Sequence, residues 1–208
     1  EVDQDLFSNF YWRKSFVVEE RRRCESTKLV KEDKTILLDI DGVLCKYPES
    51  FLNWIKLNHP DVKNLSKRKN AILWENLKAS YRLEGGKRSA IPSDFISEFT
   101  NNARNIGWKI ILFTHRPVQI YKNIEYDTMF WLKENKVYYD KIVWTSVEKA
   151  FYLISDSLQC KIFIDDEKES CVSMYNLGVR VYSPNRNVPN YIKKYTSLRE
   201  VAENEGFI

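Results

Sequence analysis

The sequence predicts an α/β protein in which helices cover both faces of a parallel β-sheet. Short runs rich in apolar and β-branched residues recur along the 208-residue chain, and segments whose apolar residues follow a helical spacing lie between them. Runs of this kind are typical of strands that are buried on both faces of a sheet. Their alternation with helices favours βαβ units and a Rossmann-like, doubly wound parallel sheet.

Five of these runs are predicted to be strands: residues 35–40, 108–113, 141–144, 161–164 and 179–182. Four segments are predicted to be helices: residues 93–106, 124–134, 147–155 and 169–177. In the second helix, Tyr126, Phe130 and Trp131 are interpreted as an apolar stripe at helical spacing. The first strand and the first helix are separated by much more chain than a simple connection needs.

That intervening segment, residues 46–89, is predicted to be a small helical cap inserted after the first strand. Its apolar residues suggest two helices that end near Gly85 and Gly86. The aromatic residues Phe51, Trp54 and Trp74 either form the core of the cap or offer a surface for a ligand. Residues 34–45 and 90–208 would then form the catalytic core, and residues 1–33 an N-terminal extension.

Composition excludes several classes of protein. The 33 basic and 29 acidic residues leave a net charge of only +4, which does not indicate a dedicated nucleic-acid binder. The four cysteines are far apart and there are only two histidines, so a zinc site is not expected. We expect the cysteines to be free thiols. No apolar run approaches the roughly 18 residues of a membrane span, and the acidic start does not resemble a signal peptide. We expect a soluble, cytoplasmic protein without a membrane partner; the sequence leaves its oligomeric state open.

Polar residues follow three of the predicted strands. Asp39 and Asp41 end the first, Thr114 to Arg116 follow the second, and Asp165 and Asp166 follow the fourth. Ligands of open α/β sheets bind beyond the carboxyl ends of the strands, so these groups are expected to lie together. Several carboxylates at one edge would repel each other unless a cation lies between them, and Mg²⁺ prefers such hard oxygen ligands.

Such a site can transfer a phosphoryl group. One carboxylate can attack phosphorus and a second can protonate the leaving oxygen. A threonine hydroxyl and a lysine can stabilise the charge on the phosphoryl oxygens. The simpler alternatives are an Asp-Gly turn after the first strand and a helix N-cap at Thr114. Two acidic pairs on two strand ends favour the catalytic interpretation.

Together, Asp39-Ile40-Asp41-Gly42, Thr114, Lys149 and Asp165-Asp166 make the chain resemble the phosphatases of the haloacid dehalogenase-like superfamily. The resemblance covers about 170 residues, from Thr35 to the C-terminus. It implies that Asp39 is the nucleophile and a metal ligand, and that Asp41 is the general acid and base and holds the metal through its backbone carbonyl. Asp165 and Asp166 would complete the Mg²⁺ site, directly or through water, and Thr114 and Lys149 would bind the phosphoryl group. Arg116 is a candidate contact for an anion of the substrate.

Two subgroups of the superfamily suggest substrates. Residues 142–149 and the start of the cap are similar to 5′(3′)-deoxyribonucleotidases, which implies a nucleotide monophosphate as substrate. Residues 127–132 and the basic N-terminal extension are similar to the phosphatase module of polynucleotide kinases, which would act on a 3′-phosphate at a nucleic-acid end. A third interpretation is a non-catalytic interaction or regulatory module with a residual site.

Overall fold

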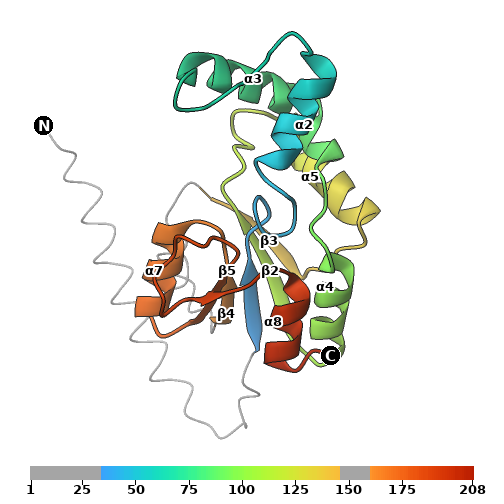
Figure 1. Ribbon diagram of the computed structural model, residues 1–208. Coiled ribbons are helices and arrows are strands. Elements are labelled where there is room, and N and C mark those ends of the chain that lie inside the picture. Colours follow the sequence, from blue (N-terminus) through green and yellow to red (C-terminus); the bar gives the residue numbers. More distant parts are fainter. Residues whose placement is uncertain (1–33, 146–159) are drawn as a thin grey trace, which may run out of the picture. The chain divides into compact units, whose positions relative to one another are not determined.

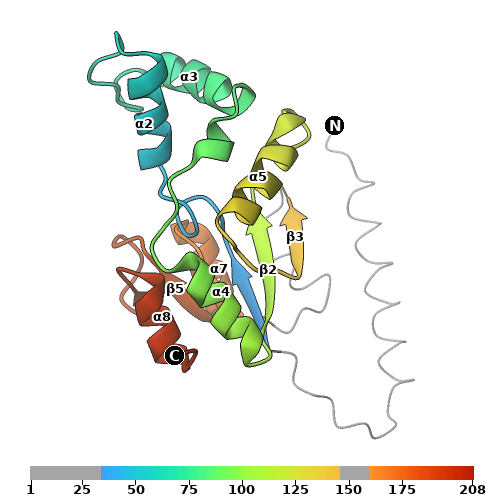
Figure 2. The same cartoon turned by 90° about the vertical axis from the view of Figure 1, so that its right-hand side faces the viewer.

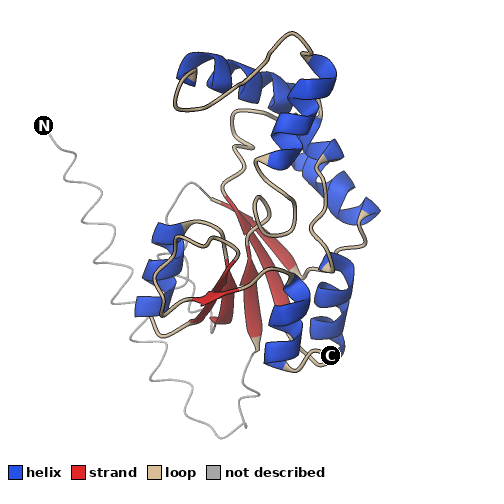
Figure 3. Ribbon diagram, in the orientation of Figure 1, coloured by secondary structure: helices blue, strands red, loops and turns tan. Residues whose placement is uncertain are grey.

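The computed structural model describes residues 34–145 and 160–208, and it contains the expected parallel sheet flanked by helices (Figures 1 and 3). Six strands lie in the order β3-β2-β1-β4-β5-β6, and every pair of neighbours is parallel. The strands are β1 (Thr35–Leu38), β2 (Lys109–Thr114), β3 (Lys141–Trp144), β4 (Cys160–Ile164), β5 (Arg180–Ser183) and β6 (Lys193–Lys194). The prediction of a Rossmann-like α/β fold is confirmed.

The register of the sheet brings the three polar strand ends to one edge. Leu38, the last residue of β1, is aligned with Leu112 of β2 on one side and with Ile164 of β4 on the other. Since all three strands run in the same direction, the residues that follow Leu38 and Ile164 leave the sheet side by side. The chain builds the sheet outward from β1 to β3 on one side and outward from β4 to β6 on the other. Ligands of doubly wound sheets bind where two such halves meet, beyond the carboxyl ends of the strands.

Side chains of β1 alternate between two cores. Ile36 and Leu38 belong to a large apolar cluster with residues of α4 (Ile96–Asn105), α5 (Asn123–Glu134) and α8 (Leu198–Glu205). Leu37 belongs to a second cluster, on the opposite face, with Cys171 and Met174 of α7 (Lys168–Asn176). This period of two is that of a strand buried on both faces, and it explains why residues 35–38 are apolar or β-branched throughout.

A helical insert, which consists of α2 (Glu49–Asn58), α3 (Ala71–Leu83) and the 3₁₀ helix η1 (Gly86–Ser89), separates β1 from α4. It lies beyond the carboxyl ends of the strands (Figures 1 and 2). Phe51, Trp54 and Trp74 are buried in its own core, where the rings of Phe51 and Trp74 pack edge to face with centroids 4.9 Å apart. Of the two interpretations of these aromatics, the structure supports the core of the insert.

The structure contains two elements that the sequence does not predict, strand β6 and helix α8. The helix expected at residues 147–155 lies outside the described residues. The apolar stripe proposed for α5 is wrong in part, because Tyr126 and Phe130 are 62% and 38% exposed while Trp131 is buried. Among the described helices, none is long and apolar enough to span a membrane.

Candidate active site

Three carboxylates gather at the carboxyl edge of the sheet. Asp39 follows β1, and Asp165 and Asp166 follow β4; one oxygen of each lies within 4.8 Å of the others. Asp39 is 6% exposed and Asp165 only 1%. Burying several like charges together is costly unless a cation neutralises them. The all-oxygen, all-carboxylate donor set suits Mg²⁺, so the residues present fit the metal that the sequence implies.

Gly42 allows the carboxylate of Asp166 to approach the loop after β1. A Cβ atom at this position would lie 2.3 Å from Oδ2 of Asp166, and the φ angle of Gly42 is +93°, which residues with a side chain rarely adopt. The loop is held by its own backbone, since the N–H groups of Leu44 and Cys45 both donate to the carbonyl of Ile40. The glycine of the Asp-x-Asp-Gly motif is therefore required both for the turn and for the acidic cluster.

Backbone contacts also orient the two aspartates that follow β4. The N–H of Glu167 donates to Oδ1 of Asp165 over 2.8 Å, which fixes that carboxylate. The side-chain amide of Asn185 donates to the carbonyl of Asp166 over 2.9 Å and ties the loop after β5 to the cluster. A hydrogen bond to a carboxylate, such as the one from Glu167 to Asp165, helps to set its orientation for metal binding.

Asp41 has different partners: its carboxylate is bound by two cations. Nε and one terminal nitrogen of Arg116 donate to its two oxygens over 3.0 and 2.8 Å, and Nζ of Lys87 donates to Oδ2 over 2.8 Å. Cys45 adds a weaker contact, from Sγ to Oδ1 over 3.2 Å. Burial opposes ionisation of Asp41, but the charges and hydrogen bonds of Arg116 and Lys87 prevail and hold its pKa well below the usual value.

The two cations reach Asp41 from different parts of the fold. Arg116 follows β2 and is 3% exposed; its other terminal nitrogen donates to Oγ1 of Thr128 on α5 over 2.7 Å. Lys87 is 5% exposed and comes from η1, so the helical insert itself contributes to the site. Its ammonium group lies 5.2 Å from the ring centroid of Tyr47, a contact that favours a cation.

In this arrangement Asp41 is ionised and can accept a proton. The ionised carboxylate of Asp41 is the form that would act as a general base toward water. To protonate a leaving oxygen, the same carboxyl group must first gain a proton, which its contacts with Arg116 and Lys87 oppose. The contacts with Arg116 and Lys87 therefore favour the ionised form of Asp41.

Most of the predicted site residues line one cavity of about 430 Å³. They are Asp39, Asp41, Thr114, Arg116, Asp165 and Asp166, and His115, Pro117 and Glu167 line it as well. Thr114 is 1% exposed, and its Oγ1 accepts a hydrogen bond from the N–H of Arg116 over 3.3 Å. Lys149 lies outside the described residues. The structure thus brings together the strand-end residues that the sequence singled out.

Sequence reasoning missed four residues of the insert and its connection that line the same cavity: Tyr47, Lys78, Arg82 and Lys87. Lys78 and Arg82 are four residues apart on α3, a spacing that places both on one face of a helix. That spacing was a usable signal. For Lys87 the only signal was its position directly after two glycines, which does not by itself indicate a buried cation.

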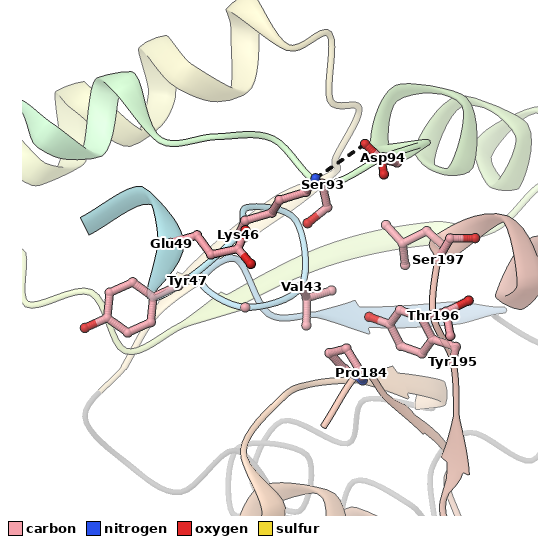
Figure 4. Close-up of a pocket in the computed structure, with 12 residues that line it drawn as sticks. Val43, Lys46, Tyr47, Glu49, Ser93, Asp94, Pro184, Tyr195, Thr196 and Ser197 are labelled. Carbon is pink, nitrogen blue, oxygen red and sulfur yellow. Dashed lines mark ion pairs between the residues drawn. The ribbon is translucent and has the colours of Figure 1, made fainter. Parts of the chain in front are cut away.

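A second cavity, of about 330 Å³, borders the loop after β1 and shares Tyr47 with the first (Figure 4). Lys46 and Asp94 face each other across it and form an ion pair of 3.7 Å. The buried hydroxyl of Tyr195 has no hydrogen-bond partner in the part of the chain that the structure describes. None of the clustered carboxylates lines this cavity, so the predicted chemistry belongs to the first one.

Comparison with known proteins bears on the fold. No family model matches the chain, and no curated protein matches its sequence. Solved structures do match it. The HAD-hydrolase YfnB from Bacillus subtilis, in a form bound to magnesium, is 13% identical with a TM-score of 0.63, and the match covers 85% of this chain and 100% of that one.

Two further structures match over similar lengths. A hydrolase of the haloacid dehalogenase-like family from Streptococcus pneumoniae is 15% identical with a TM-score of 0.57, over 85% of this chain and 100% of the other. The D,D-heptose 1,7-bisphosphate phosphatase from B. bronchiseptica, complexed with magnesium and phosphate, is 13% identical with a TM-score of 0.52, over 83% and 97%. These similarities show that the chain has the haloacid dehalogenase-like fold.

Proposed function

We propose that this protein is a Mg²⁺-dependent phosphomonoester hydrolase that forms an aspartyl-phosphate on Asp39. The observation that carries the proposal is the division of labour among the acidic residues. Asp39 belongs to a buried cluster with Asp165 and Asp166, whereas Asp41, two residues further on, is bound by Arg116 and Lys87. Separate environments for two neighbouring carboxylates are what nucleophilic and acid–base roles require.

The reaction has two displacement steps. An oxygen of Asp39 attacks phosphorus, the bond to the ester oxygen breaks, and the protonated carboxyl group of Asp41 gives its proton to the departing alcohol. Water then attacks phosphorus, Asp41 takes one proton from that water, and the bond to Asp39 breaks to release inorganic phosphate. The ionised Asp41 of the described structure is the form needed for the second step.

Other groups bind the phosphoryl oxygens and the metal. Asp39, Asp165, Asp166 and the backbone carbonyl of Asp41 would hold Mg²⁺, which supplies charge neutralisation when bound. Thr114 can donate its hydroxyl hydrogen to a phosphoryl oxygen, since its oxygen already accepts from the N–H of Arg116. Lys149 is proposed to add positive charge. Two of the structural neighbours are described as bound to magnesium, which supports the choice of cofactor.

We further propose a nucleotide as the substrate, with 5′-nucleotidase activity as the leading form. The similarity of residues 142–149 to deoxyribonucleotidases supports it, but the aromatic residues Phe51, Trp54 and Trp74 do not, because they are packed in the core of the insert. One observation favours the second candidate, a phosphatase for nucleic-acid 3′ ends: Lys78 and Arg82 line the cavity and can receive further phosphate.

Hydrolysis of p-nitrophenyl phosphate, with and without Mg²⁺, tests the proposed function. The wild-type chain should be active with Mg²⁺ and inactive after EDTA treatment, and Asp39→Asn should be inactive under both conditions. Equal activity of wild type and Asp39→Asn would refute the enzymatic role and leave the non-catalytic module as the better account. A panel of nucleotides, sugar phosphates and 3′-phosphorylated oligonucleotides then identifies the substrate class.

A further inference from the structure

Two cations of α3 line the cavity that contains the acidic cluster. Lys78 and Arg82 are one helical turn apart, and both border the cavity that contains the acidic cluster. Within the described part of the chain, neither forms an ion pair with a carboxylate. Like charges at this spacing destabilise a helix, so the pair is unfavourable for the fold when nothing binds it.

Both side chains are partly removed from water and held by aromatic rings. Burial first, and the charge of Arg82 second, lower the pKa of Lys78. Nε of Arg82 is buried and has no hydrogen-bond partner among residues 34–145 and 160–208. Nζ of Lys78 lies 5.8 Å from the ring centroid of Tyr47, and the guanidinium carbon of Arg82 lies 5.5 Å from that of Tyr121. Rings position the cations, but they do not neutralise them.

The remaining cations of this cavity are already engaged. Arg116 and Lys87 both bind the carboxylate of Asp41, at distances of 2.8 to 3.0 Å. Lys78 and Arg82 are therefore the described cavity cations that keep their charge available for a ligand. A cavity of about 430 Å³ has room for a molecule that reaches from the acidic cluster to α3.

We propose that Lys78 and Arg82 bind a second phosphate group of the substrate, distinct from the phosphate that is hydrolysed. The inference rests on the proposed phosphatase function and specifies its substrate class: a phosphomonoester whose alcohol part carries another phosphate. Two adjacent cations match the charge of a phosphate, and the forked guanidinium of arginine suits its oxygens. The second phosphate can be a free monoester, as in a nucleoside bisphosphate, or a phosphodiester, as at a phosphorylated oligonucleotide end.

The test compares five substrates with the full chain: p-nitrophenyl phosphate, the 3′- and 5′-monophosphates of thymidine, thymidine 3′,5′-bisphosphate and an oligothymidylate with a 3′-phosphate. The wild type should show a higher kcat/KM for a substrate with a second phosphate than for either monophosphate. Loss of a hydrogen bond to a charged group corresponds to roughly 10- to 100-fold in binding. Preference for the bisphosphate identifies a free phosphate as the second group, and preference for the oligonucleotide identifies a phosphodiester.

Variants then assign the preference to these residues. In Lys78→Gln, Arg82→Gln and the double variant, the ratio of kcat/KM for the preferred substrate to that for p-nitrophenyl phosphate should fall by about 10-fold or more per residue. Lys56→Gln, which removes an exposed lysine of α2, is the matched control and should leave the ratio unchanged. Melting curves check that each variant is folded, and removal of a like-charge pair should not lower Tm.

Different results separate this inference from the proposed function. If the wild type hydrolyses p-nitrophenyl phosphate but treats monophosphate and bisphosphate alike, the second-phosphate site is refuted and the phosphatase stands. An unchanged ratio in the double variant refutes it as well. If no substrate is hydrolysed, the proposed function fails; calorimetric titration of Asp39→Asn with thymidine 3′,5′-bisphosphate, with and without the double substitution, still decides the binding site.

Discussion

Replacing Gly42 with alanine tests the acidic cluster through a single methyl group. The new Cβ would lie 2.3 Å from Oδ2 of Asp166, whereas ordinary contacts begin near 3.4 Å, so the carboxylate or the loop must move by about 1 Å. Gly107→Ala is the matched control, because Gly107 has a similar φ of +88° and nothing within 4 Å of its Cβ position. The two variants share the backbone strain and differ in the contact with Asp166.

The strain of a positive φ should cost each variant about 1–2 kcal/mol of unfolding free energy. For a chain of this length, that corresponds to a fall in Tm of roughly 2–4 °C per kcal/mol. Only Gly42→Ala should also weaken Mg²⁺ binding, by about 10- to 100-fold, and a displacement of 1 Å should lower kcat by about 100-fold. Calorimetric titration with Mg²⁺ and the Mg²⁺ dependence of p-nitrophenyl phosphate hydrolysis measure the two effects.

Equal Mg²⁺ affinity and equal kcat in the two variants would refute this role of Gly42. In that case Asp166 would not need its present position against the loop, and the acidic cluster would not be the metal site. A loss of Tm in Gly42→Ala alone, with unchanged Mg²⁺ dependence, would contradict the account equally, because the contact would then be purely structural.

Three further predictions concern the surroundings of Asp41. Arg116→Lys should lower kcat by about 10- to 100-fold, since an ammonium group cannot make two parallel hydrogen bonds to one carboxylate. An unchanged kcat in steady-state assays would show that the paired hydrogen bonds from Arg116 to Asp41 do not contribute to catalysis. Thr128→Val removes the hydroxyl acceptor of the buried Arg116 and should cost about 1–3 kcal/mol in chemical denaturation, and a stability equal to wild type would show that water replaces it. Burial and the charge of Asp41 raise the pKa of Cys45 to about 12, so at pH 8 iodoacetamide should modify it in unfolded chains and spare it in native ones. Peptide mapping after alkylation would contradict this if Cys45 reacted equally in both.

The strand-end residues could be predicted because local sequence determines them. Runs of apolar, β-branched residues are recognisable as buried strands, and in a parallel sheet the residue after each strand lies at the carboxyl edge. The sequence alone therefore identifies Asp39, Thr114 and Asp165 as residues at the carboxyl edge of the sheet. The short strand β6, with only Lys193 and Lys194, carries no such pattern.

The partners of Asp41 could not be predicted, because they depend on contacts between segments that are distant in the sequence. Arg116 is 75 residues away and Lys87 is 46 residues away. The sequence alone does not distinguish a buried lysine from an exposed one; for Lys87, the contact with Asp41 does so.

In helix α5, hydrophobicity alone does not identify the buried face. The sequence predicts a buried stripe of aromatic residues, yet the buried positions include Asp127 and Thr128. Asp127 accepts hydrogen bonds from Arg88, and Thr128 accepts one from Arg116. Meanwhile the exposed Tyr126 and Phe130 lie under the guanidinium of Arg88, with ring centroids 5.1 and 5.4 Å from its central carbon. Polar residues that bind cations therefore share the buried face of α5 with the apolar Ile124, Trp131 and Leu132.

Acid-quench mass spectrometry of the phosphorylated protein shows whether Asp39 is the nucleophile. The chain is mixed with Mg²⁺ and p-nitrophenyl phosphate, quenched within one turnover and mapped by peptides; Asp41→Asn is included because slower hydrolysis should let the intermediate accumulate. We expect one phosphoryl group on Asp39, absent without Mg²⁺ and absent in Asp39→Asn. A phosphoryl group on another residue, or active turnover with no phosphorylated protein in either chain, would overturn the assignment of Asp39.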